Sequence, residues 1–341
     1  MLIQFTNSAL LIIMVVQMLT GLYVLFWPVS PLVMNLHRWG GWALLGLLPW
    51  KAIIVYRSLS RGLKKTWDRG LVPILSSLMA GLLILLLAAG LAWTWRIGDW
   101  LVLLGQTVIS WHWVFGLAIL PIFIIHIWRR WPNPSRRFLL TRRAAVRALG
   151  FGSFGVLGWL MAERLARQQE AEEHPRSPNT GSREYRSFSG NAMPVTTNFG
   201  ENPRRLDPET WRLRIDGLVA SPLEVSYQQL MDIPIKTITA TVDCTVGWYS
   251  TQHWRGIPVM DLVRRADPDT RANFLRFWSD TGYNKSFSLA ESERILLGTH
   301  VGNETINHSH GFPVRAVVPG WRGWFWVKWV TRIQVVSRPA A

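Results

Sequence analysis

The stretch Ile238-Thr239-Ala240-Thr241-Val242-Asp243-Cys244 decides how the C-terminal half of this chain folds. Its residues are mostly apolar or β-branched, which favours a β-strand. Cys244 closes the run and is the only cysteine in 341 residues, so it forms no internal disulfide. Two interpretations of Cys244 stay open at this point. It is either a small buried hydrophobe or a thiolate held at the end of a strand for a soft metal.

Outward from this run, the chain divides into two unlike halves. The whole sequence is 49% hydrophobic and 17% charged, but long apolar runs dominate residues 1–162 alone. Residues 163–187 are polar and charged, and they predict a solvated linker. Residues 188–341 have the composition of a soluble domain of roughly 150 residues, which is long enough for a core of its own.

The N-terminal half predicts an all-α transmembrane bundle of about five helices. The first four apolar segments are long enough to cross about 30 Å of hydrocarbon, whereas the fifth is shorter and rich in glycine. The five segments are residues 8–28, 36–56, 72–94, 102–128 and 146–162.

The net charge is +16, and the basic residues are distributed as in the loops of a membrane protein. This distribution argues against a nucleic-acid partner. Basic residues concentrate in two loops, after the second and after the fourth apolar segment. They are Arg57, Arg61, Lys64, Lys65 and Arg69, then Arg129, Arg130, Arg136, Arg137, Arg142, Arg143 and Arg147. By the positive-inside rule both loops are cytoplasmic. We therefore expect a multi-pass protein of the cytoplasmic membrane, with its C-terminal domain outside.

Two arginine pairs precede the fifth apolar segment, Arg136-Arg137 and Arg142-Arg143. Paired arginines before a short, weakly hydrophobic helix resemble a twin-arginine export signal, which would carry a folded domain across the membrane. The alternative is an ordinary basic cytoplasmic loop. The sequence leaves both interpretations open.

Three histidines lie in or beside the apolar segments, where ionisable side chains are costly. His37 opens the second segment, and His112 and His126 both lie on the fourth. A separation of fourteen residues is almost four helical turns, so His112 and His126 share a face about 21 Å apart. The pattern favours haem ligands over interfacial or helix-capping histidines.

On these histidines, residues 1–130 resemble the di-haem cytochrome b subunits of formate dehydrogenases and nickel–iron hydrogenases. The resemblance implies an outer haem b held by His37 and His112, and a membrane quinone as redox partner. In that family the first helix supplies an inner histidine, but this chain has Gln4 and Asn7 in that region. His126 therefore either holds a second haem with another ligand, such as a methionine, or lines a quinone pocket.

The C-terminal half predicts an α+β domain rich in strands. Alternating or β-branched runs and turn residues mark the strands, and one apolar run marks a helix. The predicted strands are 211–219, 221–227, 238–244, 274–278, 312–320 and 329–336, and helices are expected after residue 227 and at 259–266.

Three blocks make residues 188–337 similar to the molybdopterin-binding fold of sulfite oxidases and of the periplasmic methionine-sulfoxide reductase catalytic subunit. The blocks are Thr210-Trp211-Arg212-Leu213 with Gly217-Leu218-Val219 and Pro222-Leu223; Cys244 with Trp248, Trp254, Gly256 and Pro258; and His310-Gly311-Phe312-Pro313-Val314-Arg315 with Val318-Pro319-Gly320 and Val327-Lys328-Trp329. The third block is long and specific.

The resemblance implies a molybdenum–molybdopterin cofactor with Cys244 as thiolate ligand to molybdenum. Arg315 and Lys328 match positions that hold the pterin phosphate through charge-assisted hydrogen bonds. Tyr283 matches the active-site tyrosine of sulfite oxidases. The remaining positions that match cofactor contacts are Asn198, Ser279, His310, Trp326 and Val327.

The chain departs from sulfite oxidases directly after the cysteine. Residues 245–250 contain no arginine, although sulfite oxidases place an anion-binding arginine there. The pocket is instead expected to be aromatic, with Trp248, Tyr249 and Trp254, which suits a sulfoxide or an N-oxide. An oxo-anion site could still use Arg255 or Arg322.

The sequence thus predicts a membrane-bound molybdopterin oxidoreductase that performs two-electron oxo transfer outside the cytoplasm and exchanges electrons with quinone through haem b. The segment 321–326, rich in tryptophan, is expected to seat the domain on the lipid bilayer. One alternative is a non-catalytic haem b electron carrier with a degenerate outer domain. Another is an enzyme that uses haem alone and carries an outer binding module.

Overall fold

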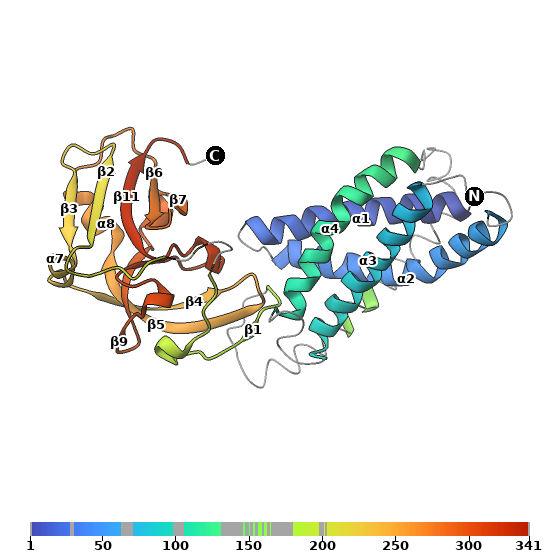
Figure 1. Cartoon of the computed structure of the whole chain (residues 1–341), viewed down its shortest axis with the longest axis horizontal. Helices are drawn as coiled ribbons and strands as arrows, with labels where there is room; N and C mark the ends of the chain where they lie inside the picture. Colours follow the sequence, from blue (N-terminus) through green and yellow to red (C-terminus); the bar gives the residue numbers. More distant parts are fainter. Residues whose placement is uncertain are drawn as a thin grey trace. The chain divides into compact units, whose positions relative to one another are not determined.

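The computed structural model describes residues 2–27, 31–62, 71–97, 106–130, 180–197 and 203–339, together with Glu201 and scattered positions between 146 and 164. The chain divides into two compact units, Met1–Gly181 and Ser182–Ala341. Figure 1 shows helices in the first unit and mainly strands in the second. Each unit is described by itself.

The N-terminal unit contains four long helices in its described part: α1 (Leu2–Phe26), α2 (Pro31–Gly62), α3 (Leu71–Thr94) and α4 (Val108–Arg130). A helix is the fold expected in lipid, because it satisfies its own backbone hydrogen bonds. α1 packs along α2 and α3 along α4. Buried side chains from three of these helices form an apolar cluster, with Met14, Leu44, Ile119 and Phe123 at its centre.

Three of these helices are long and apolar enough to cross a membrane, judged by length and composition. The spans are Thr6–Leu25, Ile74–Thr94 and Val108–Trp128, and they favour multi-pass anchoring. The predicted segment 36–56 lies within the long helix α2, which is not among these three spans, so its crossing of the membrane stays a prediction. Most of the fifth predicted segment lies outside the described residues.

The C-terminal unit is an α+β domain, as predicted. Its strands are β1 (Arg183–Glu184), β2 (Arg212–Gly217), β3 (Leu223–Ser226), β4 (Lys236–Asp243), β5 (Trp248–Pro258), β6 (Phe274–Ser279), β7 (Asn284–Ser288), β8 (Leu296–Val301), β9 (Glu304–Thr305), β10 (Arg315–Val317) and β11 (Val330–Val336). Its helices are α7 (Tyr227–Met231), α8 (Val259–Arg265) and α9 (Leu289–Ser292), with 3₁₀ turns η3 (Gly190–Ala192), η4 (His308–His310) and η5 (Gly323–Phe325).

Two sheets organise this domain. One has the order β3-β2-β11-β6-β7, and the other has β1-β5-β8-β10, with β4 paired to β5 and β9 to β8. β2, β11, β6 and β7 lie side by side in Figure 1. β11 occupies the centre of its sheet, parallel to β2 and antiparallel to β6.

The five-stranded sheet buries one face, because its strands alternate apolar and polar side chains. Ile333 on β11 lies between Ile215 of β2 and Phe277 of β6 in the strand register, and all three side chains are fully buried. Each such side chain contributes about 1.5–3 kcal/mol through burial. This row ties together three segments that are far apart in the sequence.

Several predicted elements are confirmed. The run that ends at Cys244 is β4, the predicted strand at 211–219 contains β2, and the predicted helix at 259–266 is α8. β1 lies within residues 163–187, the range that the sequence assigns to the linker, and it pairs in parallel with β5.

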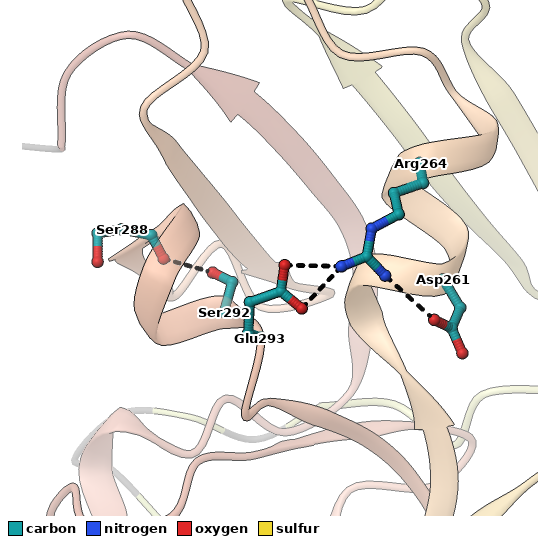
Figure 2. Close-up of polar contacts among 5 residues, drawn as sticks. All are labelled: Asp261, Arg264, Ser288, Ser292 and Glu293. Atoms are coloured by element: carbon teal, nitrogen blue, oxygen red, sulfur yellow. Dashed lines mark hydrogen bonds and ion pairs between the residues drawn. The ribbon is translucent and has the colours of Figure 1, made fainter.

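A polar network on the surface joins the two short helices α8 and α9. Nη2 of Arg264 donates to both carboxylate oxygens of Glu293, at 2.7 and 2.8 Å, and Nη1 of Arg264 donates to Asp261 at 3.5 Å. Ser292 donates to the carbonyl of Ser288 within α9 (Figure 2). Exposed ion pairs contribute at most about 1 kcal/mol, so this network orders the surface more than it stabilises the domain.

Candidate active site

Cys244 stands at the head of a tight turn between β4 and β5. Its N–H donates to the carbonyl of Trp248 at 2.8 Å, and its carbonyl accepts from the N–H of Gly247 at 3.1 Å. Gly247 has a φ of +94°, a backbone conformation that glycine adopts at little cost. The strand and the turn thus fix the backbone of Cys244 on both sides.

Cys244 lines an open cleft whose empty space, including the solvent at its mouth, is about 630 Å³. One wall is apolar or aromatic and another carries nitrogen cations. The described lining residues are Met193, Pro194, Thr196, Thr197, Glu201, Val242, Cys244, Thr245, Trp248, Tyr283, His310, Arg315, Gly323, Trp324, Trp326 and Lys328. This composition is typical of a binding site for an organic ligand with anionic groups.

Arg315, the first residue of β10, is a buried cation. Its guanidinium carbon lies 5.1 Å from the ring centroid of Trp254 and 5.6 Å from that of Trp326. Burial lowers the pKa of Arg315 to about 9, and Cys244 opposes the shift. Nε of Arg315 has no hydrogen-bond partner among the described residues. An orphaned buried donor on a cation is costly and indicates a missing anionic ligand.

Lys328 is the second cation of the cleft. Its ammonium donates to the carbonyls of Thr196 at 2.9 Å and Ser309 at 2.7 Å. Burial and then the charge of Arg315 lower the pKa of Lys328 to about 7, while Cys244 and Glu201 oppose the shift. A second anion-seeking group therefore faces the same cleft.

His310 ends η4 beside these cations. Burial, followed by the charge of Arg315, lowers the pKa of His310 to about 4, so the ring is neutral near pH 7. Its Nε2 lies 3.2 Å from the carbonyl of Asn191 and donates to it. His310 thus adds a neutral ring to a cationic wall.

The thiol of Cys244 is buried, and burial raises its pKa. The N–H of Val246 and the hydroxyl of Thr196 oppose this shift by hydrogen bonding, as does the charge of Arg322. A soft metal would hold such a sulfur as a thiolate. The buried thiol therefore fits a molybdenum that the dithiolene of a pterin would hold, and the two cations fit the anionic phosphate of that pterin.

Tyr283 and Trp324 form the aromatic side of the cleft. The hydroxyl of Tyr283 donates to the carbonyl of Trp324 at 2.6 Å. The ammonium of Lys285 lies 5.3 Å from the Tyr283 ring centroid and 4.6 Å from that of Trp324. Burial lowers the pKa of Lys285. The ring of Tyr283 is therefore held by its neighbours from both ends.

The structure brings most of the predicted site residues together. The residues that line the cleft are Cys244, Tyr283, His310, Arg315, Trp326 and Lys328. Two predicted contacts do not line it among the described residues: Ser279, which accepts a hydrogen bond from Thr281, and Val327, which is buried. Asn198 lies outside the described residues.

Two expectations about this region need correction. Trp248 lines the cleft, but Tyr249 and Trp254 are buried behind it. Neither Arg255 nor Arg322, the arginines considered for an oxo-anion, is among the described lining residues. Arg322 instead forms a buried ion pair with Asp243.

The segment 321–326 does not offer an exposed aromatic surface to a bilayer. Arg322, Phe325 and Trp326 are buried, and the Trp326 ring packs against that of Trp254. The hydrophobicity of the segment is used inside the domain, so the prediction of a membrane seat is wrong for these side chains.

Sequence reasoning missed Thr196, and it considered Arg322 only as a partner for an oxo-anion. Thr196 contacts three parts of the site: its hydroxyl accepts from Trp248, its carbonyl accepts from Lys328, and it hydrogen-bonds Cys244. Neither residue belongs to a motif, and only the fold shows where they lie.

In the N-terminal unit, His37 of α2 and His112 of α4 face each other. Their ring centroids are 6.1 Å apart and their planes are inclined by 83°. Nδ1 of His112 donates to the carbonyl of Leu86 at 2.8 Å. Nδ1 of His37 lies 2.9 Å from the hydroxyl of Thr20, which already donates to the carbonyl of Val16. Each Nδ1 therefore carries the proton, and the lone pair of each ring stays on Nε2.

Two glycines make room for these rings. A Cβ on Gly21 would lie 3.2 Å from Cε1 of His37, and one on Gly90 would lie 3.1 Å from Cε1 of His112. Larger residues would press on both imidazoles. The small residues of α1 and α3 therefore permit the close approach of the two histidines to the neighbouring helices.

His126, on the same helix as His112, has a different environment. Its Nδ1 lies 3.4 Å from the hydroxyl of Ser76. Near the start of α1, the side chain of Asn7 accepts a hydrogen bond from Lys51 at 2.7 Å. The side chain of Gln4 lies outside the described residues.

The comparisons with known proteins concern the C-terminal half. Residues 199–341 match the model of the oxidoreductase molybdopterin binding domain. The chain is 28% identical over 148 residues to the uncharacterized oxidoreductase YuiH of Bacillus subtilis, which covers 41% of this chain and 75% of that protein.

Two further relatives have named activities. The protein-methionine-sulfoxide reductase catalytic subunit MsrP of Gluconobacter oxydans is 27% identical over 244 residues, which is 61% of this chain and 75% of that protein. Mitochondrial sulfite oxidase of Mus musculus is 29% identical over 182 residues, 44% of this chain. The match spans only 32% of that mouse protein.

The fold, the cleft and these matches define the C-terminal unit as a molybdopterin-binding oxidoreductase domain. The matched part of the chain is thus a molybdopterin oxidoreductase domain that is similar to those of the MsrP proteins and of sulfite oxidase.

Proposed function

We propose that this protein is a membrane-anchored molybdenum oxidoreductase in which Cys244 binds the metal. One observation carries the proposal: the buried thiol shares a cleft with Arg315 and Lys328, and no carboxylate among the described residues accepts a hydrogen bond from either cation. When bound, the molybdenum cofactor supplies two-electron oxo transfer.

The residues of the cleft have different proposed roles toward the cofactor and the substrate. Arg315 and Lys328 hold the anionic phosphate through charge-assisted hydrogen bonds. His310 and Trp326 flank the pterin, and Tyr283 faces the substrate. The remaining proposed contacts are Asn198, Ser279 and the backbone of Val327.

The substrate that the cleft favours is a neutral sulfoxide or N-oxide. Met193, Pro194 and Trp248 give the lining an apolar character. The cations of the cleft are assigned to the cofactor, and Arg322 is occupied by Asp243. An oxo-anion such as sulfite would therefore lack a dedicated partner. The reductase activity named for the MsrP relatives supports the same class of substrate.

In the N-terminal unit, we propose that His37 and His112 hold one haem b. Two imidazoles bound to one metal through Nε2, at about 2 Å each, place their ring centroids about 6 Å apart. The observed separation is 6.1 Å. Haem supplies one-electron transfer, which would connect the molybdenum domain with a membrane quinone. His126 is proposed either for a second haem or for the quinone pocket.

The proposed location is the cytoplasmic membrane, with the molybdenum domain outside. Its support is the positive charge of the two loops between apolar segments, which follows the positive-inside rule. The arginine pairs at 136–137 and 142–143 are proposed either as an export signal or as part of a basic loop.

The first experiment is elemental analysis of the purified full-length protein. About one molybdenum and one iron per chain would support both cofactors. Cys244→Ser should remove molybdenum and leave iron, and the matched control Thr241→Ser should change neither. Molybdenum retained by Cys244→Ser would refute the ligand assignment, and iron alone in wild-type protein would favour the electron carrier.

The haem assignment is tested by two histidine variants and an absorbance spectrum. His37→Ala should abolish the haem bands. His126→Ala should leave them intact if the protein holds one haem, and should halve them if it holds two. Unchanged haem bands in the His37→Ala variant would refute the haem assignment.

A further inference from the structure

A buried ion pair lies directly behind the proposed metal ligand. Nη1 of Arg322 donates to Oδ2 of Asp243 at 2.6 Å, and the two side chains are only 7% and 9% exposed. Replacing such a pair by apolar residues is often neutral or stabilising, so stability alone is a poor reason for its presence. Its position suggests another role.

Both partners are tied to the backbone of Cys244. Asp243 is the preceding residue, at the end of β4, and it forms a parallel bridge with Arg322. Nη2 of Arg322 donates to the carbonyl of Cys244 at 3.2 Å. The ion pair therefore binds the same carbonyl that accepts the turn hydrogen bond from Gly247, while Cys244 still lines the cleft.

Gly323, the residue after Arg322, packs closely against the backbone of Asp243 and Cys244. A Cβ on Gly323 would lie 3.3 Å from the carbonyl oxygen of Asp243 and 3.4 Å from Cα of Cys244. The segment that carries Arg322 thus lies directly against the ligand-bearing turn. A displacement of Arg322 would be transmitted to Cys244 by direct contact.

The charges of the pair act on the sulfur with opposite signs. The cation of Arg322 favours negative charge on Cys244, and the anion of Asp243 disfavours it. Because both groups are buried, water screens these effects weakly. The two charges therefore oppose each other at the sulfur, and removing either one leaves the other unbalanced.

We propose that Asp243 and Arg322 are positioning residues that clamp the backbone of Cys244 and set the reduction potential of the bound molybdenum through the balance of their charges. This inference rests on the proposed function, in which Cys244 is the molybdenum ligand. Neither residue touches the substrate.

The proposal predicts the sign of each effect. Reduction of Mo(VI) to Mo(V) adds one negative charge to the site. Asp243→Asn removes a nearby negative charge and should favour Mo(V). Arg322→Gln removes a positive charge and should favour Mo(VI). We expect each single variant to change the equilibrium about tenfold, which is about 59 mV for one electron. The double variant should return close to the wild-type potential.

The experiment is a redox titration of full-length protein in detergent, with the Mo(V) electron paramagnetic resonance signal as readout, after molybdenum per chain has been measured. The matched control is Asp216→Asn. Asp216 is also buried and paired with arginines, Arg214 and Arg332, but it lies on the five-stranded sheet and not in the cleft. Its variant should leave the potential unchanged.

Opposite shifts that cancel in the double variant would support the proposal. Shifts of the same sign, or none beyond the Asp216→Asn control, would overturn it and leave the cofactor assignment standing. If Arg322→Gln fails to accumulate, Asp243→Asn keeps the side-chain shape and decides alone, because an unchanged or lowered potential contradicts the proposal. Wild-type protein without molybdenum would instead overturn the proposed function, and this inference with it.

Discussion

Arg315 is the side chain on which the charge of the cleft most depends. Its buried guanidinium lies against Trp254 and Trp326, and Nε lacks a partner among the described residues. A hydrogen bond to a charged group contributes about 1.5–3 kcal/mol, so Arg315→Met should weaken cofactor retention at least tenfold. Molybdenum per chain after gel filtration measures this loss.

The matched control for that variant is Arg276→Met. Arg276 also contacts an indole ring, that of Trp278, but it lies on the five-stranded sheet away from the cleft. Equal molybdenum losses in the two variants would contradict a specific role for Arg315.

Lys328 predicts a dependence of stability on pH. In the folded, cofactor-free protein its pKa is lowered to about 7, from 10.5. Between these two values the unfolded chain binds more protons than the folded one, so this group makes the free energy of unfolding rise with pH. Below about pH 7 both states are protonated and the destabilising effect is complete.

Lys328→Met should therefore flatten this rise. The measurement is the thermal midpoint of cofactor-free protein between pH 7 and 10, in wild type and variant. A steeper rise in the variant than in wild type would contradict the buried, anion-free environment described for Lys328. A bound anion should restore the ordinary pKa, and the dependence should then disappear.

At the residue scale the sequence predicts part of the site. Cys244 is conspicuous because no other cysteine competes with it. Arg315 and Lys328 could be assigned only through the family pattern, because an isolated basic residue near a strand end is usually solvated. The sequence offers Arg322, beside Arg255, as one of two arginines that an oxo-anion could use, since sequence spacing does not show that Asp243 is paired with it.

At the scale of elements, Gly311 joins the η4 turn to the strand that carries Arg315. Its φ is +109°, and a Cβ there would lie 3.1 Å from Cβ of Arg315 and 3.0 Å from Cβ of Lys328. Gly311→Ala should cost about 1–3 kcal/mol in strain and also move both cations.

Gly320→Ala is the control for that prediction, because Gly320 has a φ of +85° and no atom within 4 Å of an added Cβ. Gly320→Ala should lower the free energy of unfolding by about 1–2 kcal/mol, because of the left-handed backbone conformation alone. Denaturant midpoints and molybdenum content of the two variants separate strain from crowding. A smaller effect at position 311 than at 320 would count against the described packing.

Local patterns predicted the elements better than their arrangement. The β-branched run before Cys244 and the alternation at 211–219 identify β4 and β2 because each depends on neighbouring residues only. The pairing of β2 with β11 joins residues more than a hundred positions apart, which no local pattern contains. Trp326 lies in the core, contrary to the expectation for its segment, for a related reason: composition does not distinguish a core from a membrane interface.

At the scale of the whole molecule, the two units carry separate candidate sites, one with His37 and His112 and one around Cys244. The orientation of the chain in the membrane bears on the function of both sites. The positive-inside rule predicts that the C-terminal unit lies outside the cytoplasm. A protease cleavage site after residue 339 should therefore be cut in intact spheroplasts.

The control for topology is the same cleavage site placed in the basic loop at residues 63–70. It should resist protease until the membrane is permeabilised. Protection of the C-terminal site in intact spheroplasts would contradict the proposed orientation and would place oxo transfer in the cytoplasm.

The central position of β11 in its sheet bears on the order in which the protein is made. A ribosome synthesises β2, β3, β6 and β7 before β11, so the early strands must wait for the one that joins them. Lys328, just before β11, emerges equally late. If Lys328 holds the cofactor as proposed, we expect cofactor loading to follow the synthesis of this strand.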